Sequence, residues 1–179
     1  MELLPVEEIE CHLQTHIPHR LNLLLSYSMM QNKLSNIEYK FRNNINFCMI
    51  EMSMVSARMF IEFLGFYVDP DNQLKSKTNP KKDDVNLDSF DIEPIAVEKI
   101  NKADQGILIK MYRTANKSVA HLTSSDGDYK IFEKRENMAI ILRLLDENLY
   151  KKLGIEFPID IDLFVQDDSY YWSYSEYSK

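Results

Sequence analysis

Apolar residues along this chain recur mostly at spacings of three and four, and they seldom alternate with polar residues. A repeat of about 3.6 residues is typical of a helix with one buried face, and no two neighbouring segments alternate as paired strands would. Glycine, which interrupts helices, occurs four times in 179 residues. The pattern therefore predicts an all-α fold, a helical bundle of four main helices plus short additional helices.

Two helices are expected near the start of the chain, over 5–14 and 18–34. Pro18 suits the first turn of a helix and interrupts one that is already running, so it should separate the two. The third helix, over 37–64, is the longest and carries apolar residues on two sides. Such a helix is expected to pack at the centre of the domain, with Gly65 as its C-terminal stop.

Residues 69–90 contain prolines, asparagines and the run Lys-Lys-Asp-Asp, with few apolar side chains. This composition predicts the main polar loop of the domain. A short helix is expected over 94–100. Longer amphipathic helices are expected over 104–122 and 134–153, and Gly154 should end the last one.

Residues 1–164 should thus form a single helical domain. The remaining residues, 165–179, are acidic, serine-rich and aromatic without a clear helical period. We therefore expect a flexible C-terminal tail. The alternative is a tail that docks on a partner through its tyrosines and Trp172.

The composition, with 45% hydrophobic and 27% charged residues, is that of an ordinary globular domain. A net charge of −7 repels nucleic acid, so any RNA contact requires a local basic patch. The start of the chain lacks a basic region followed by an apolar run, and the most apolar stretch is interrupted by Glu51, Arg58 and Glu62. Cys11 and Cys48 show no disulfide-rich pattern. These features predict a cytoplasmic protein with no membrane partner.

Candidate chemistry is concentrated near the end of the helix over 104–122. Arg113, Lys117 and His121 fall on a stripe of about 80°, away from the face that should be buried. Arginine and lysine bind phosphate, and histidine exchanges protons near neutral pH, so His121 could act on a ribose 2′-hydroxyl or a leaving oxygen. Asn116 would position the ligand. The alternative is a solvated helix face whose last histidine interacts with the helix dipole.

A second polar line follows the third predicted helix, where Glu51, Arg58 and Glu62 fall within about 40° of one another. Polar residues on a central helix need partners or water, so Arg58 and Glu51 are expected to line the same cleft as His121. Arg58 would then contact RNA phosphate, with Glu51 in support. The alternative is an exposed strip with a weak ion pair between Arg58 and Glu62.

The histidines near the start of the chain suggest a metal site only weakly. His12 and His16 are four residues apart, with Cys11 and His19 beside them, but Pro18 is expected to break the helix and no carboxylate recurs at a matching distance. We predict no metal site. No phosphate-binding glycine loop or nucleotide-binding motif occurs in the sequence, so no cofactor is predicted either.

Three segments resemble small bacterial helical proteins of the HEPN superfamily: SARMFIEFLG at 56–65, DDVNLDSF at 83–90 and NKSVAHLT at 116–123. The resemblance covers about residues 20–153. The HEPN motif is an arginine, often followed by a polar residue, and then a histidine after four to six intervening residues. Asn116 and His121 fit this motif, whereas Ala115 stands where the arginine is expected. Arg113, or Arg58 from the neighbouring helix, would have to supply the missing cation.

The resemblance implies a helical bundle that commonly forms a homodimer. Many such domains are metal-independent endoribonucleases of toxin, phage-defence or RNA-processing systems. In that case two copies of His121 would meet at the dimer interface, and a 2′-hydroxyl would attack the adjacent RNA phosphate. The implied partners are a second copy, an RNA substrate, and an antitoxin or other protein. The competing interpretation is a catalytically inactive HEPN-like dimerisation or protein-binding module.

Overall fold

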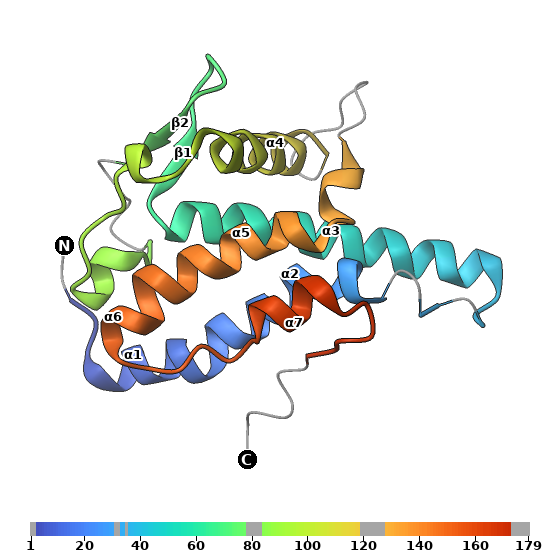
Figure 1. The fold of residues 1–179 in the computed structure, drawn as a ribbon, viewed down its shortest axis with the longest axis horizontal. Helices are drawn as coiled ribbons and strands as arrows, with labels where there is room; N and C mark the ends of the chain where they lie inside the picture. The colour runs from blue at the N-terminus through green and yellow to red at the C-terminus, as the bar shows by residue number, and fades with distance from the viewer. Residues whose placement is uncertain (1–2, 31–32, 35, 78–83, 119–127, 173–179) are drawn as a thin grey trace.

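The computed structural model describes residues 3–30, 33–34, 36–77, 84–118 and 128–172. It is mostly helical, which confirms the predicted class (Figure 1). The strands of the described part are β1 (Phe66–Val68) and β2 (Leu74–Ser76). In chain order its helices are α1 (Val6–Cys11), η1 (His12–His16), α2 (Ile17–Met30), α3 (Tyr39–Phe63), η2 (Leu87–Phe90), η3 (Val97–Lys99), α4 (Lys102–Ser118), η4 (Tyr129–Phe132), α5 (Arg135–Leu145), η5 (Asp146–Tyr150), α6 (Lys151–Leu153) and α7 (Ile161–Gln166).

Helix α3 is the spine of the domain, and α2 and α4 both pack on it (Figure 1). Its C-terminal half is fully buried on the core side, through Met54, Ala57, Phe60 and Ile61. Gly65 follows the helix with a φ of +86°, a left-handed conformation that favours glycine. The central position and the stop are therefore confirmed for this half. The N-terminal half instead projects beyond the neighbouring helices.

The predicted break at Pro18 is wrong, because α1, η1 and α2 form one continuous helix from Val6 to Met30. The turn before Pro18 is a π-helix, in which the Ile17 N–H donates to the carbonyl of His12. In a regular helix the proline ring would clash with the carbonyl four residues earlier, and a locally wider turn relieves that clash. Side chains on both sides of Pro18 consequently share one helix.

The loop predicted over 69–90 contains regular structure that the sequence analysis missed. β1 and β2 pair antiparallel, with Phe66 opposite Ser76 and Val68 opposite Leu74. The turn between them contains Asn72 at a φ of +61°. Strands of three residues are too short to show an alternating pattern, which explains why the sequence did not predict them. In the structure they pack against α3 and α4. Residues 78–83 lie outside the described part.

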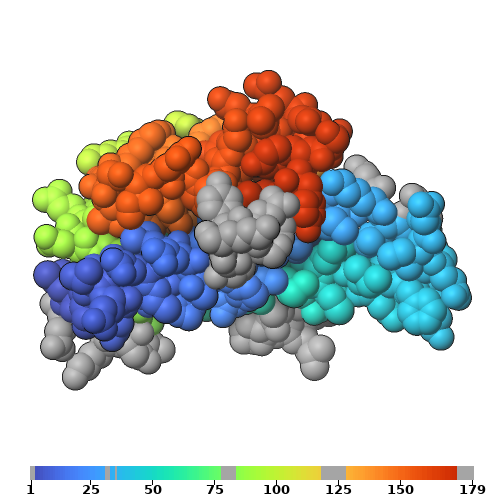
Figure 2. All heavy atoms as spheres, turned by 90° about the horizontal axis from the view of Figure 1, so that it is seen from below, coloured from blue at the N-terminus to red at the C-terminus, as the bar shows by residue number. Residues whose placement is uncertain are grey.

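The last strong helix matches its prediction, since α5, η5 and α6 run from Arg135 to Leu153 and Gly154 ends them at a φ of +69°. The flexible tail is wrong for residues 165–172. Helix α7 packs on α5, and the two segments lie side by side in Figure 2. The side chain of Trp172 is only 4% exposed. Residues 173–179 lie outside the described part.

A single arginine holds this C-terminal segment. Arg135 is 7% exposed and donates hydrogen bonds to the backbone carbonyls of Phe164 at 2.9 Å and Asp167 at 2.7 Å. It also donates to the carbonyl of Asp168 at 3.0 Å, and its guanidinium lies 5.1 Å from the centre of the Phe164 ring. The buried charge is thus satisfied by carbonyl oxygens rather than by a carboxylate.

Across the described part of the chain, no helix combines the length and the apolar character that crossing a membrane requires.

Candidate functional site

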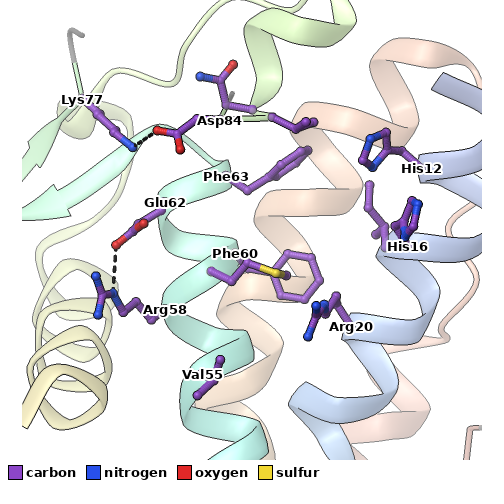
Figure 3. A pocket seen from close by; sticks show the side chains of 14 residues that line it. His12, His16, Arg20, Val55, Arg58, Phe60, Glu62, Phe63, Lys77 and Asp84 are labelled. Carbon is purple, nitrogen blue, oxygen red and sulfur yellow. Dashed lines mark hydrogen bonds and ion pairs between the residues drawn. The ribbon is translucent and has the colours of Figure 1, made fainter. Parts of the chain in front are cut away.

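A groove of about 540 Å³ lies over the C-terminal half of α3 (Figure 3). Its floor is apolar and includes Val55, Met59 and Phe63. This volume falls in the usual range for small-ligand sites, which combine apolar walls with a few polar groups. The charged and polar side chains that line it are His12, His16 and Arg20 from the first helix, Arg58 and Glu62 from α3, and Lys77, Asp84 and Asn86 beyond the hairpin.

Arg58 and Glu62 form a cluster with α4. The Nε of Arg58 donates to Oε1 of Glu62 at 2.9 Å, and the Tyr112 hydroxyl donates to the same oxygen at 3.0 Å. The Arg58 guanidinium lies 5.5 Å from the centre of the Tyr112 ring. The Arg58 side chain is nevertheless 38% exposed and lines the groove, so its guanidinium can be reached from solvent. It is therefore available to an anion in the groove.

The environment keeps Tyr112 protonated. Burial raises the pKa of its hydroxyl, and the neighbouring Glu62 carboxylate raises it further. Arg58 and the side-chain amide of Asn116 act in the opposite direction. Asn116 lies one turn beyond Tyr112 on α4. The residues around Tyr112 thus include an arginine, a carboxylate and an amide from two facing helices.

Arg113 points elsewhere. Its terminal nitrogen donates to the backbone carbonyl of Asp69, at the end of β1, and its Nε is buried without a hydrogen-bond partner. Arg113 does not line the groove. This hydrogen bond connects the hairpin to α4, so the partly buried Arg113 side chain is engaged without any ligand.

The other predicted site residues are only partly brought together. Asn116 is half-buried beside Tyr112, whereas Lys117 and Glu51 are exposed. Glu51 does not line the groove, so the structure does not bring it to Arg58. His121 lies outside the described residues, and its role as acid or base stays a prediction.

The sequence analysis missed the second wall of the groove. The rings of His12 and His16 lie 4.8 Å apart, and His12 packs edge-on against Phe90 at 6.2 Å. Burial lowers the pKa of His12, the nearby His16 lowers it further, and Glu8 opposes the shift. His12, His16 and Arg20 are spaced by four in the sequence. We did not place them on one helix face, because we expected the helix to break at Pro18.

The groove is slightly basic although the chain is acidic. Lys77 pairs with Asp84 at 2.6 Å, and Arg58 pairs with Glu62. Arg20 has no ion-pair partner among the described residues. Three cations and two carboxylates therefore leave one net positive charge, against −7 for the whole chain. Within the described ranges, no three histidine, cysteine or acidic side chains gather as a metal site would require.

Comparison with protein families, with curated proteins and with solved structures finds no match to this chain. The function must therefore be argued from the groove and from the sequence motifs.

Proposed function

We propose that this protein is a HEPN-like, metal-independent endoribonuclease of a bacterial toxin or phage-defence type, in which Arg58 supplies the cation of the motif. One observation carries the proposal. Arg58 lies over the ring of Tyr112, one turn before Asn116, on the helix whose sequence continues to His121. Arg113, the nearer candidate in sequence, is engaged by the hairpin.

The reaction requires no metal ion. A ribose 2′-hydroxyl gives its proton to a base and attacks the adjacent phosphorus, while the bond from phosphorus to the 5′-oxygen breaks. The leaving oxygen takes a proton from an acid, so the products carry a 2′,3′-cyclic phosphate and a 5′-hydroxyl. We assign the acid or base to His121, and the binding of the phosphate oxygens to Arg58.

The cluster around Glu62 suits Arg58 to this task. Glu62 engages the Nε edge of the guanidinium, and the Tyr112 ring supports its face. A guanidinium fixed in this way presents its terminal nitrogens with less loss of side-chain entropy when a phosphate binds. In this proposal Asn116, which hydrogen-bonds to Tyr112, orients the RNA from beside the groove, and the exposed Lys117 adds a positive charge.

The test is cleavage of a mixed RNA pool in EDTA by the wild type and by His121→Ala, prepared identically. We expect fragments with 2′,3′-cyclic phosphate ends from the wild type, and a loss of about 100-fold or more in the variant. No cleavage by the wild type, or equal cleavage by both proteins, would remove the nuclease proposal.

A different observation supports a second candidate, a dimerisation or protein-binding module without catalysis. Along α3, apolar side chains follow the alternating spacing of four and three that characterises a coiled-coil seam. Four of these side chains are between 37% and 58% exposed, and the fifth, Cys48, is also exposed. The seam consists of Phe41, Ile45, Cys48, Met52 and Val55.

The seam spans more than half of α3, which suits an extended helical partner. The exposed Tyr39 and Phe47 lie on other faces of this helix at about 100° per residue, so they do not add to the seam. The matching occupant is a second amphipathic helix, and a second copy of this chain supplies one. The N-terminal half of α3 projects from the bundle (Figures 1 and 2), and the seam side chains are exposed, so a second helix can reach them.

Light scattering tests this candidate. A homodimer should have twice the mass of the 21.1 kDa chain. Phe41→Glu with Met52→Glu should restore the monomer, whereas Lys40→Glu, at an exposed position on another side of the same helix, should not. A wild type that is monomeric at high concentration would exclude self-association, and would leave the seam to an antitoxin or other protein.

A further inference from the structure

The first helix carries three groove residues on successive turns. His12, His16 and Arg20 are spaced by four, and the π-turn keeps them on one uninterrupted helix. All three line the groove on the side opposite Arg58 (Figure 3). His12 is held between His16 and Phe90, so this wall is partly fixed before any ligand binds.

The charges on the two walls differ in how they are compensated. Arg58 and Lys77 each have a carboxylate partner. Arg20 is exposed and has no such partner in the described part of the chain. Burial and the nearby His16 disfavour a positive charge on His12, and Glu8 on the same helix offsets this only in part. No carboxylate of the first helix lines the groove, so a ligand could supply the missing negative charge.

We propose that the wall formed by His12, His16 and Arg20 is a second phosphate subsite, which binds a phosphodiester of single-stranded RNA across α3 from Arg58. This inference rests on the proposed nuclease function and names its substrate more closely. A single strand carries phosphates on both sides of an unpaired base. The groove offers cations on both sides of the apolar floor at Val55, Met59 and Phe63.

Protonation should link this subsite to pH. The charged groups near His12 are Glu8 and His16 on its own helix, with Arg20 one turn beyond. The charged groups across the groove are Arg58, Glu62, Lys77 and Asp84. A bound phosphate favours the imidazolium, so RNA binding should take up a proton and strengthen as pH falls.

The experiment measures binding of a fluorescent 2′-O-methyl RNA by anisotropy, because this RNA lacks the attacking hydroxyl and cannot be cleaved. At 0.1 M salt, Arg20→Gln should weaken binding about five- to tenfold and lower the salt slope by about 0.7. The matched control is Lys110→Gln, an exposed lysine on α4 outside the groove, which should bind as the wild type does. Equal melting temperatures would show that the variants are folded.

A second arm compares pH 5.5 with pH 8. The wild type should bind the RNA more tightly at pH 5.5, and His12→Gln with His16→Gln should remove that difference. Inorganic phosphate should compete only at far higher concentration. Competition by phosphate as strong as that by RNA would overturn the assignment to RNA.

Failure of this inference can be distinguished from failure of the nuclease. If the wild type binds the RNA through Arg20 but cleaves none, the subsite stands and the nuclease proposal fails. If the wild type cleaves RNA while Arg20→Gln binds as tightly as the wild type, the subsite is overturned and the nuclease stands.

Discussion

Replacing Arg58 and Arg113 with glutamine, one at a time, should affect different properties of the protein. Arg113→Gln removes a charge-assisted hydrogen bond to the Asp69 carbonyl, worth about 1.5–3 kcal/mol, and relieves a buried Nε without a partner, worth about 1 kcal/mol. The net loss of stability is about 0.5–2 kcal/mol. For a chain of this size, that loss lowers the melting temperature by about 1–8 °C.

Arg58→Gln should show the opposite balance. The Arg58 and Glu62 side chains are 38% and 32% exposed, so solvent screens their ion pair to about 0.5 kcal/mol. The melting temperature should fall by about 1–2 °C. Loss of a hydrogen-bond donor to the reacting phosphate should reduce kcat/KM for RNA cleavage by about 10²–10³.

Both quantities are measured on the same preparations, by thermal melting and by RNA cleavage at 25 °C in EDTA. A folded Arg113→Gln that loses as much cleavage as Arg58→Gln would refute the reasoning. It would assign the motif's cation to Arg113 and leave Arg58 as a surface ion pair.

Two further predictions concern stability. The folded pKa of His12 lies below its unfolded value of 6.5, so as pH falls below 6.5 the unfolded chain takes up the proton first and stability decreases. Urea midpoints at pH 7.5 and 5.5 should therefore differ less in His12→Gln than in the wild type; an equal difference would contradict this. Arg135→Met should destabilise the protein by about 3–5 kcal/mol, because four carbonyl contacts lose their donor. Chymotrypsin should then cleave the variant between Tyr170 and Trp172. The control is Lys134→Met, at the exposed residue before Arg135, which should leave this segment protected from chymotrypsin.

The fold could be predicted where its determinants are local. The amphipathic pattern and the glycine stop sufficed for α3 and for the helix that ends at Gly154. The hairpin and the docked C-terminal segment depend on distant contacts. Arg135 reaches carbonyls about 30 residues away, and spacing along the chain does not encode such a contact.

The candidate site, too, could be predicted from the sequence only in part. Asn116 and Arg58 both lie beside Tyr112, at the contact between α3 and α4, while their roles in RNA binding stay predictions. Spacing could not show that Arg113 turns to a carbonyl 44 residues away, in a hairpin that was not predicted. The histidine wall was missed for a different reason, since a rule that usually holds for proline failed at a π-turn.

The contact made by Arg135 has a consequence for sequence variation. Its hydrogen bonds go to backbone oxygens of the C-terminal segment, and its nearest carboxylate, on Asp168, is 3.9 Å away and 95% exposed. Hydrogen bonds to main-chain atoms do not depend on most of the side chains in the bound segment. Asp168, whose side chain is 95% exposed, should therefore be free to change, in evolution or by design, as long as the arginine and the path of the backbone are kept. Asp167 is more constrained, because its carboxylate also accepts hydrogen bonds from the backbone and hydroxyl of Ser169.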